Sequence, residues 1–169
     1  MSSDTNTISR RAALIGGGAS LGLSACGFAP IYGDTAPARA LDGRIAVSKI
    51  DGKMGFAACK RLTDRLGPAT AATHQLTVTL DVTRDGLGIS QTNQITRYNL
   101  TGTASYRVIS LAAGVPVETG IARAFAAYSA TASPFATRIA EEDAHTRLAI
   151  SLADQIVTRV SATADRWLP

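Results

Sequence analysis

The stretch HQLTVTLDVT, residues 74–83, alternates apolar and polar side chains along its whole length. Successive side chains of a β-strand point to opposite faces, so this pattern predicts a strand with one buried face and one solvated face. Alternation of this kind is typical of antiparallel sheets that are covered on one side only. The residues expected on the buried face are Leu76, Val78, Leu80 and Val82.

Two more segments downstream have strand character. Residues 95–109 alternate again, and residues 115–128 form a third long segment with a less regular pattern. Asp85-Gly86 with Gly88 predicts a loop after the first strand, and Ala113-Gly114 predicts a turn after the second. Three long strands with short connections predict an antiparallel meander. The residues expected on the buried face of the second strand are Tyr98, Leu100, Gly102, Ala104, Tyr106 and Val108.

A short strand and a helix precede the meander. Residues 44–50 are a strand candidate closed by Asp51-Gly52, and residues 53–66 carry apolar side chains at helical spacing. Gly67-Pro68 ends this helix, because glycine suits the C-terminal cap and proline cannot continue the hydrogen-bonding pattern.

A long helix follows the meander and begins at Ser133-Pro134, with serine as the N-cap. Its apolar residues are expected to pack on the sheet. The order β-α-β-β-β-α predicts an α+β fold, with one antiparallel or mixed four-stranded sheet and two helices packed on one face. The helix residues expected against the sheet are Phe135, Ile139, Leu152, Ile156 and Val160.

The N-terminal region, residues 1–25, has the pattern of an export signal. Arg10 and Arg11 precede a modest apolar run, residues 12–23, which small residues follow. The run is too short and too rich in glycine to span a bilayer as a permanent helix. The sequence leaves two export routes open, since Ser9-Arg10-Arg11 is similar to a twin-arginine signal and equally fits a general secretory signal.

Leu23-Ser24-Ala25-Cys26 resembles the bacterial lipobox. That resemblance implies cleavage before Cys26, a diacylglycerol on its thiol, further acylation such as palmitate on its amine, and a stable membrane anchor. The alternative is an ordinary secretory signal with a chance cysteine. Residues 26–42 then read as the lipidated N-terminus and a tether, and residues 43–169 as the folded domain.

Charge and composition restrict the classes of partner. The net charge is +4, and removal of Arg10, Arg11 and Asp4 with the signal leaves +3. No basic run occurs, which argues against nucleic acid and remains compatible with an anionic, phosphorylated partner.

No motif for a metal site, a nucleotide cofactor or a catalytic nucleophile occurs in the sequence. Cys59 is the cysteine left beside Cys26, and its helical position predicts a small core residue. The contiguous Glu141-Glu142-Asp143 points in several directions on a helix, which predicts a solvated face rather than acid–base chemistry. A periplasmic hydrolase would need His74 or His145 beside a nucleophile or carboxylate, and the prediction is that the protein is not an enzyme and holds no cofactor.

Three segments, taken in order, resemble the LptE family of lipopolysaccharide-assembly lipoproteins, particularly its alphaproteobacterial branch. They are CGFAPIYG at residues 26–33, IDGKMGFAACKRLTDRL at residues 50–66 and RIAEEDAHTRLAISLADQIVTRV at residues 138–160. Ala58-Cys59 departs from the family pattern, in which longer polar residues are expected.

The resemblance implies an outer-membrane lipoprotein on the periplasmic side. Such a protein plugs an LptD-type β-barrel, supports assembly of that barrel and assists lipopolysaccharide delivery to the outer leaflet. By analogy, lipopolysaccharide would be contacted by Arg84, Arg97 and Arg107, which otherwise read as solvated strand residues. An auxiliary lipoprotein of another envelope lipid transporter is the alternative.

Overall fold

The computed structural model describes residues 41–89 and 95–168. The N-terminal signal, Cys26 and most of the tether therefore lie outside the described residues. The elements are β1 (Ile45–Val47), α3 (Gly52–Leu66), β2 (His74–Ile89), β3 (Ile95–Ser110), β4 (Pro116–Ser129), α4 (Pro134–Thr163) and the short 3-10 helix η2 (Ala164–Arg166).

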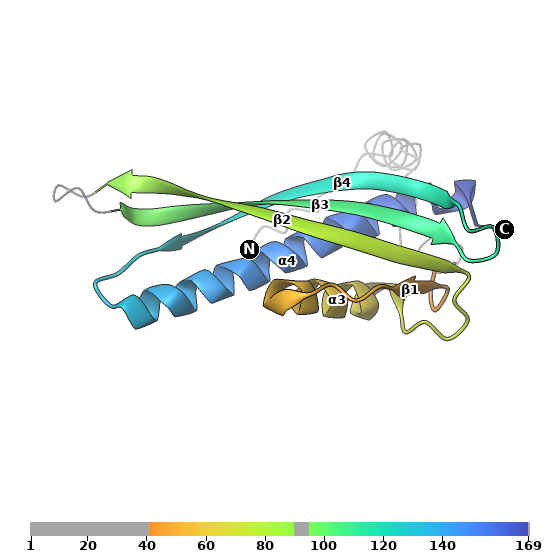
Figure 1. Ribbon diagram of the computed structural model, residues 1–169, viewed down its shortest axis with the longest axis horizontal. Coiled ribbons are helices and arrows are strands. Elements are labelled where there is room, and N and C mark those ends of the chain that lie inside the picture. The colour runs from red at the N-terminus through yellow and green to blue at the C-terminus, as the bar shows by residue number, and fades with distance from the viewer. Residues whose placement is uncertain (1–40, 90–94, 169) are drawn as a thin grey trace, which may run out of the picture. The chain divides into compact units, whose positions relative to one another are not determined.

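The strands form one mixed sheet in the order β1-β2-β3-β4. β1 runs parallel to β2, and the β2-β3 and β3-β4 pairs are antiparallel. Figure 1 shows α3 and α4 on one side of this sheet. The α+β fold, the element order and the antiparallel meander are thus confirmed.

The core lies between the sheet and α4, and small strand residues bring the two layers close. Ala104 pairs in register with Leu80 on one side and Ala122 on the other, and both alanines are fully buried. A Cβ added at Gly102 would lie 3.0 Å from side-chain carbons of Leu148 and Leu152. The alternation of β2 and β3 therefore turns one face of each strand toward the helices, as the sequence predicts.

The phase of α4 differs from the prediction in its first turns. Leu152, Ile156 and Val160 are buried, whereas Phe135 is 68% exposed and Ile139 is 48% exposed. The prediction was wrong for these two residues because residues 139 and 152 are separated by about 3.6 turns, which puts them on nearly opposite sides of the helix. Alanines fill the inward positions there, since Ala144 is fully buried.

The connections agree with the sequence in part. Ser133 accepts a hydrogen bond from the Ala136 amide, and Gly67 caps α3 with φ of 77°. The prediction of a loop at Asp85-Gly86 was wrong. β2 continues through these residues to Ile89, with an irregular register to β3 from Gly86 onward. Extra residues in such a bulge disturb the ladder without ending the strand.

Two residues near the start of the domain also differ in burial from expectation. Leu41, which the sequence places in the tether, is fully buried in the core. Cys59 is half-buried, and its thiol donates to the backbone oxygen of Ser48 at 3.3 Å. The packed part of the chain therefore begins at or before Leu41.

Candidate functional site

The sheet face opposite the helices carries rows of polar side chains. The strand registers align Thr77, Arg107 and Thr119 in one row and Asp81, Thr103 and Arg123 in another. All of these except the half-buried Thr103 are exposed. Ile121 and Phe125 interrupt the polar surface along β4, at 44% and 79% exposure. We call this surface, formed by the odd-numbered residues from Thr77 to Thr83, Thr101 to Arg107 and Thr119 to Phe125, the outer sheet face.

A hollow of about 400 Å³ lies at one end of the outer sheet face. Hydroxyl groups and one guanidinium dominate its lining, which suits polar, hydroxylated or phosphorylated ligands. On the helix-facing side of the same strands, the Tyr106 ring packs on Gly120, where an added Cβ would lie 2.5 Å from the tyrosine oxygen. The lining residues are Thr77, Thr79, Ser105, Tyr106, Arg107, Thr119, Gly120 and Ile121.

The three arginines named from the sequence are not brought together. Arg107 lines the hollow, and Arg97 lies near the other end of β3, paired in register with Ser129. Ten residues of extended strand separate them by about 33 Å. Arg84 has the parity of the helix-facing residues of β2 and is exposed beside its fully buried register partner Leu100.

Arg84 is engaged in a cluster at that end of the sheet. Its guanidinium donates to Glu141 at 2.9 Å and lies 5.1 Å from the centre of the Tyr98 ring. Tyr98 stacks on Tyr128 with ring centres 5.2 Å apart. Hydrogen bonds to Tyr128 and Glu141 raise the pKa of Arg84, and burial raises the pKa of Tyr128. The cluster ties β2, β3 and β4 to α4.

The acidic cluster of α4 is divided among three cations. Glu141 pairs with Arg84 of β2, Glu142 with Lys53 of α3, and Asp143 with Arg147 one turn later. The three carboxylates therefore point in different directions, as predicted, and two of them join α4 to other elements.

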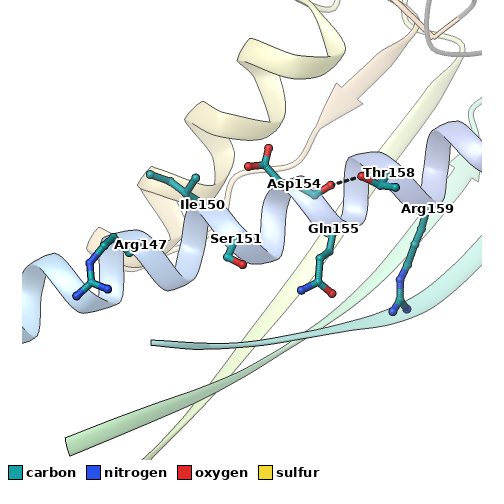
Figure 2. Close-up of a pocket in the computed structure, with 7 residues that line it drawn as sticks. All are labelled: Arg147, Ile150, Ser151, Asp154, Gln155, Thr158 and Arg159. Carbon is teal, nitrogen blue, oxygen red and sulfur yellow. Dashed lines mark hydrogen bonds between the residues drawn. The ribbon is translucent and has the colours of Figure 1, made fainter. Parts of the chain in front are cut away.

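A second hollow, of about 490 Å³, follows α4. Figure 2 shows Arg147, Gln155 and Arg159 pointing toward the strands, and Asp154 pointing the other way. The first three donate to the backbone oxygens of β4, and Asp154 accepts two hydrogen bonds from Arg61 at 2.8 and 3.0 Å. These lining groups already have partners within the fold, which makes the hollow a poor ligand site.

The two histidines lie in separate surroundings. His74 is buried against Trp167, with ring centres 4.9 Å apart, and its Nδ1 lies 2.9 Å from the Thr73 hydroxyl. Burial and the nearby charge of Arg44 lower the pKa of His74, which favours the neutral ring. Within residues 41–89 and 95–168, no hydrogen bond joins His74 or His145 to a carboxylate.

The described residues contain neither a cluster of metal ligands nor a helix able to cross a membrane. No group of three or more histidine, cysteine, aspartate or glutamate side chains is placed to hold a metal ion in this part of the chain. Among the same residues, no helix combines the length and apolarity needed to cross a membrane.

The folded part of the chain matches a known protein family. The profile of the LptE family, described as lipopolysaccharide-assembly, matches residues 43–160. The chain belongs to the LptE family. Membership covers β1 through nearly all of α4 and supports a role in lipopolysaccharide assembly.

Solved structures of bacterial lipoproteins share the fold of this LptE family member. A lipoprotein from Caulobacter crescentus CB15 has a TM-score of 0.63 at 17% identity, over 76% of this chain and 96% of its own. The rare lipoprotein B from Shewanella oneidensis has a TM-score of 0.56 at 16% identity, over 73% and 96%. A minor lipoprotein from Acinetobacter baumannii has a TM-score of 0.54 at 17% identity, over 71% and 90%. No curated protein sequence matches the chain.

The sequence placed Thr79 and Ser105 on the polar faces of their strands but did not predict that they line a hollow with Thr119. Serine and threonine are abundant, and single residues of these types carry little signal. The strand alternation was the usable signal, since it places these residues on one face once the registers of β2, β3 and β4 are known.

Proposed function

We propose that this LptE family member is an outer-membrane lipoprotein, held on the periplasmic side by a lipid on Cys26. It occupies the interior of an LptD-type β-barrel, supports assembly of that barrel and assists lipopolysaccharide delivery to the outer leaflet. The family match over residues 43–160 carries this proposal. The proposed role is non-enzymatic.

The chemistry of the outer sheet face supports a place inside a barrel. The lumen of a large outer-membrane barrel is polar and wet. A plug therefore needs a surface of hydroxyl, amide and charged groups, which the rows through Thr77, Arg107 and Asp81 supply. Hydroxyl groups also tolerate water at imperfectly matched contacts, because they can donate or accept.

A cross-linking experiment tests the barrel assignment. We expect a photo-activated cross-linker placed at Ser105, which is exposed on the outer sheet face, to capture an outer-membrane barrel in intact cells. The adducts are identified by mass spectrometry after solubilisation in detergent. Capture of subunits of a different lipid transporter, with no barrel, would instead support an auxiliary lipoprotein of that transporter.

Lipopolysaccharide contact by Arg84, Arg97 and Arg107 is a separate proposal. Arg107 is supported best, because it lines the hollow of the outer sheet face and no salt bridge holds it in the described part of the chain. Arg97 is exposed at the other end of β3, and Arg84 would have to leave Glu141 or bind beside it.

We expect Arg107→Glu to weaken lipopolysaccharide binding by the purified lipoprotein about tenfold or more, since a charge-assisted hydrogen bond contributes about 1.5–3 kcal/mol. Arg97→Glu should act in the same direction. The measurement is a binding titration with purified lipopolysaccharide. Arg166→Glu, at an exposed position of η2, is the control for net charge. Equal losses in all three variants would mean that only overall charge matters.

A further inference from the structure

The backbone groups along the two edges of the sheet have different partners. Along β4, side chains of α4 donate to backbone oxygens that point away from β3: Arg147 to Ala127 at 3.2 Å and Gln155 to Arg123 at 2.8 Å. Arg159 donates in the same way to the backbone oxygen of Ile121. The β4 edge is therefore covered by its own helix.

Within the part of the chain that the structure describes, a strand covers the opposite edge for only three residues. β1 pairs with residues 74–76, and the hydrogen bond from the Ser48 amide to the Leu76 oxygen, at 2.9 Å, closes this ladder. The amide of His74 donates to the Arg44 oxygen, on the same side as the bond between Ser48 and Leu76. Since both are even-numbered residues of β2, the even-numbered residues turn their backbone groups toward β1. The even-numbered residues beyond Leu76 consequently present their N–H and C=O groups outward.

We call the outward N–H and C=O groups of Val78, Leu80, Val82 and Arg84 the open edge of β2. Among the described residues, no hydrogen bond ends on any of them. The register with β3 is regular throughout, with irregularity starting only after Gly86. The open edge thus extends for about 20 Å, at about 3.3 Å per residue.

An edge of this kind is a template for another strand. Proteins usually protect long edges with proline, bulges or a covering element, as α4 does for β4. β2 contains no proline, and its irregular part lies beyond the open edge. An added strand would satisfy the four outward N–H and C=O pairs, which is how sheet edges recognise extended peptides.

The side chains beside the open edge define the chemistry of that strand. On the helix-facing side, Leu80 and Val82 are only half-buried, whereas Leu76 is fully buried. On the outer side, Asp81 and Asp85 are exposed and form no ion pair within the described part of the protein. A complementary strand therefore carries apolar residues toward the helices and lysine or arginine on the outer side.

We propose that an extended segment of the barrel partner, with this apolar and basic alternation, adds to the open edge of β2. The inference rests on the proposed function for the source of the segment. A second copy of this chain fits less well, since antiparallel pairing of two β2 strands would gather Asp81 and Asp85 of both copies on one face.

Hydrogen exchange on the purified lipoprotein, alone and co-purified with the barrel, tests the proposal. The amides of Val78, Leu80 and Val82 should exchange about tenfold or more slowly in the complex than in the free lipoprotein. The amides of Thr79 and Asp81 already face β3, and their protection in both samples is the internal control. Measurement by mass spectrometry with single-residue fragmentation separates the two sets.

A pair of proline variants tests the same edge by recovery of the barrel. Leu80→Pro removes an outward amide that has no partner in the described residues, so the ladder to β3 is kept. We expect it to lower the co-purified barrel by about tenfold or more. Ser129→Pro, at an exposed position of β4 outside the outer sheet face whose amide also points outward, should change recovery by less than about twofold.

The outcomes separate the two proposals. A barrel that co-purifies while the Val78, Leu80 and Val82 amides exchange as fast as in the free lipoprotein would overturn the strand addition alone. Absence of any barrel would overturn the proposed function and the strand addition together. Protection of the open edge in a homodimer without the barrel would overturn the assigned occupant. If Leu80→Pro fails to fold, the exchange experiment decides by itself.

Discussion

Leu152→Ala is expected to destabilise the domain by about 2–5 kcal/mol, the usual cost of truncating a buried leucine and leaving a cavity. Leu152 is fully buried, and its side chain lies over Gly102 at the closest approach of α4 to the sheet. The strand residues under it are glycine and alanine, whose side chains are too short to fill the space from the sheet side. Urea unfolding, with the midpoint and slope compared to the original protein, measures the loss.

Ile139→Ala is the matched control on the same helix. Ile139 is 48% exposed, so truncation should change the free energy of unfolding by less than about 0.5 kcal/mol. Equal losses for the two variants would contradict the helix phase described above. Equal losses would instead match the packing first expected from the sequence, in which both residues lie against the sheet.

Cys26→Ser is expected to abolish the lipid anchor and lower the outer-membrane fraction of the protein by about a hundredfold or more, because each buried methylene contributes about 0.8 kcal/mol. A serine hydroxyl does not replace the thiol in the proposed lipidation. The measurement is incorporation of labelled palmitate together with fractionation of the membranes.

Cys59→Ser is the control for Cys26→Ser. Cys59 lies in α3, where its thiol contacts the Ser48 oxygen, and it should leave palmitate incorporation unchanged. Labelling that persists in Cys26→Ser and disappears in Cys59→Ser would contradict the lipobox interpretation. Retention of both variants in the outer membrane would show that the partner alone holds the protein there.

Prediction from the sequence succeeded where a local pattern determines structure. Alternation in residues 74–83 assigned the buried face of β2, and Ser133-Pro134 located the start of α4. It failed for Phe135 and Ile139, because at 3.6 residues per turn Ile139 lies on nearly the opposite side of the helix from Leu152, so the two could not both face the sheet. It also ended β2 too early at Gly86, since glycine signals a bulge as readily as a loop.

At the candidate site, too, local features were predictable from the sequence, whereas contacts between distant segments were not. The sequence placed the cations Arg84, Arg97 and Arg107 on or beside strands. This assignment follows from the local pattern and does not require knowing which residues contact them. Their separation depends on strand register and on α4. Glu141 is distant in the sequence from Arg84, and its carboxylate lies 2.9 Å from that guanidinium only when the helix crosses the sheet.

By itself, the sequence determined the elements of this protein, their order and the polarity of each strand face, because these follow from side-chain periodicity along a few consecutive residues. Only the tertiary structure decided which edge of the sheet is covered. The three side chains of α4 that meet the β4 oxygens, and the short β1 that leaves the open edge of β2, are contacts between distant segments. No local pattern encodes such contacts, since they depend on how the packed helix is oriented over the sheet.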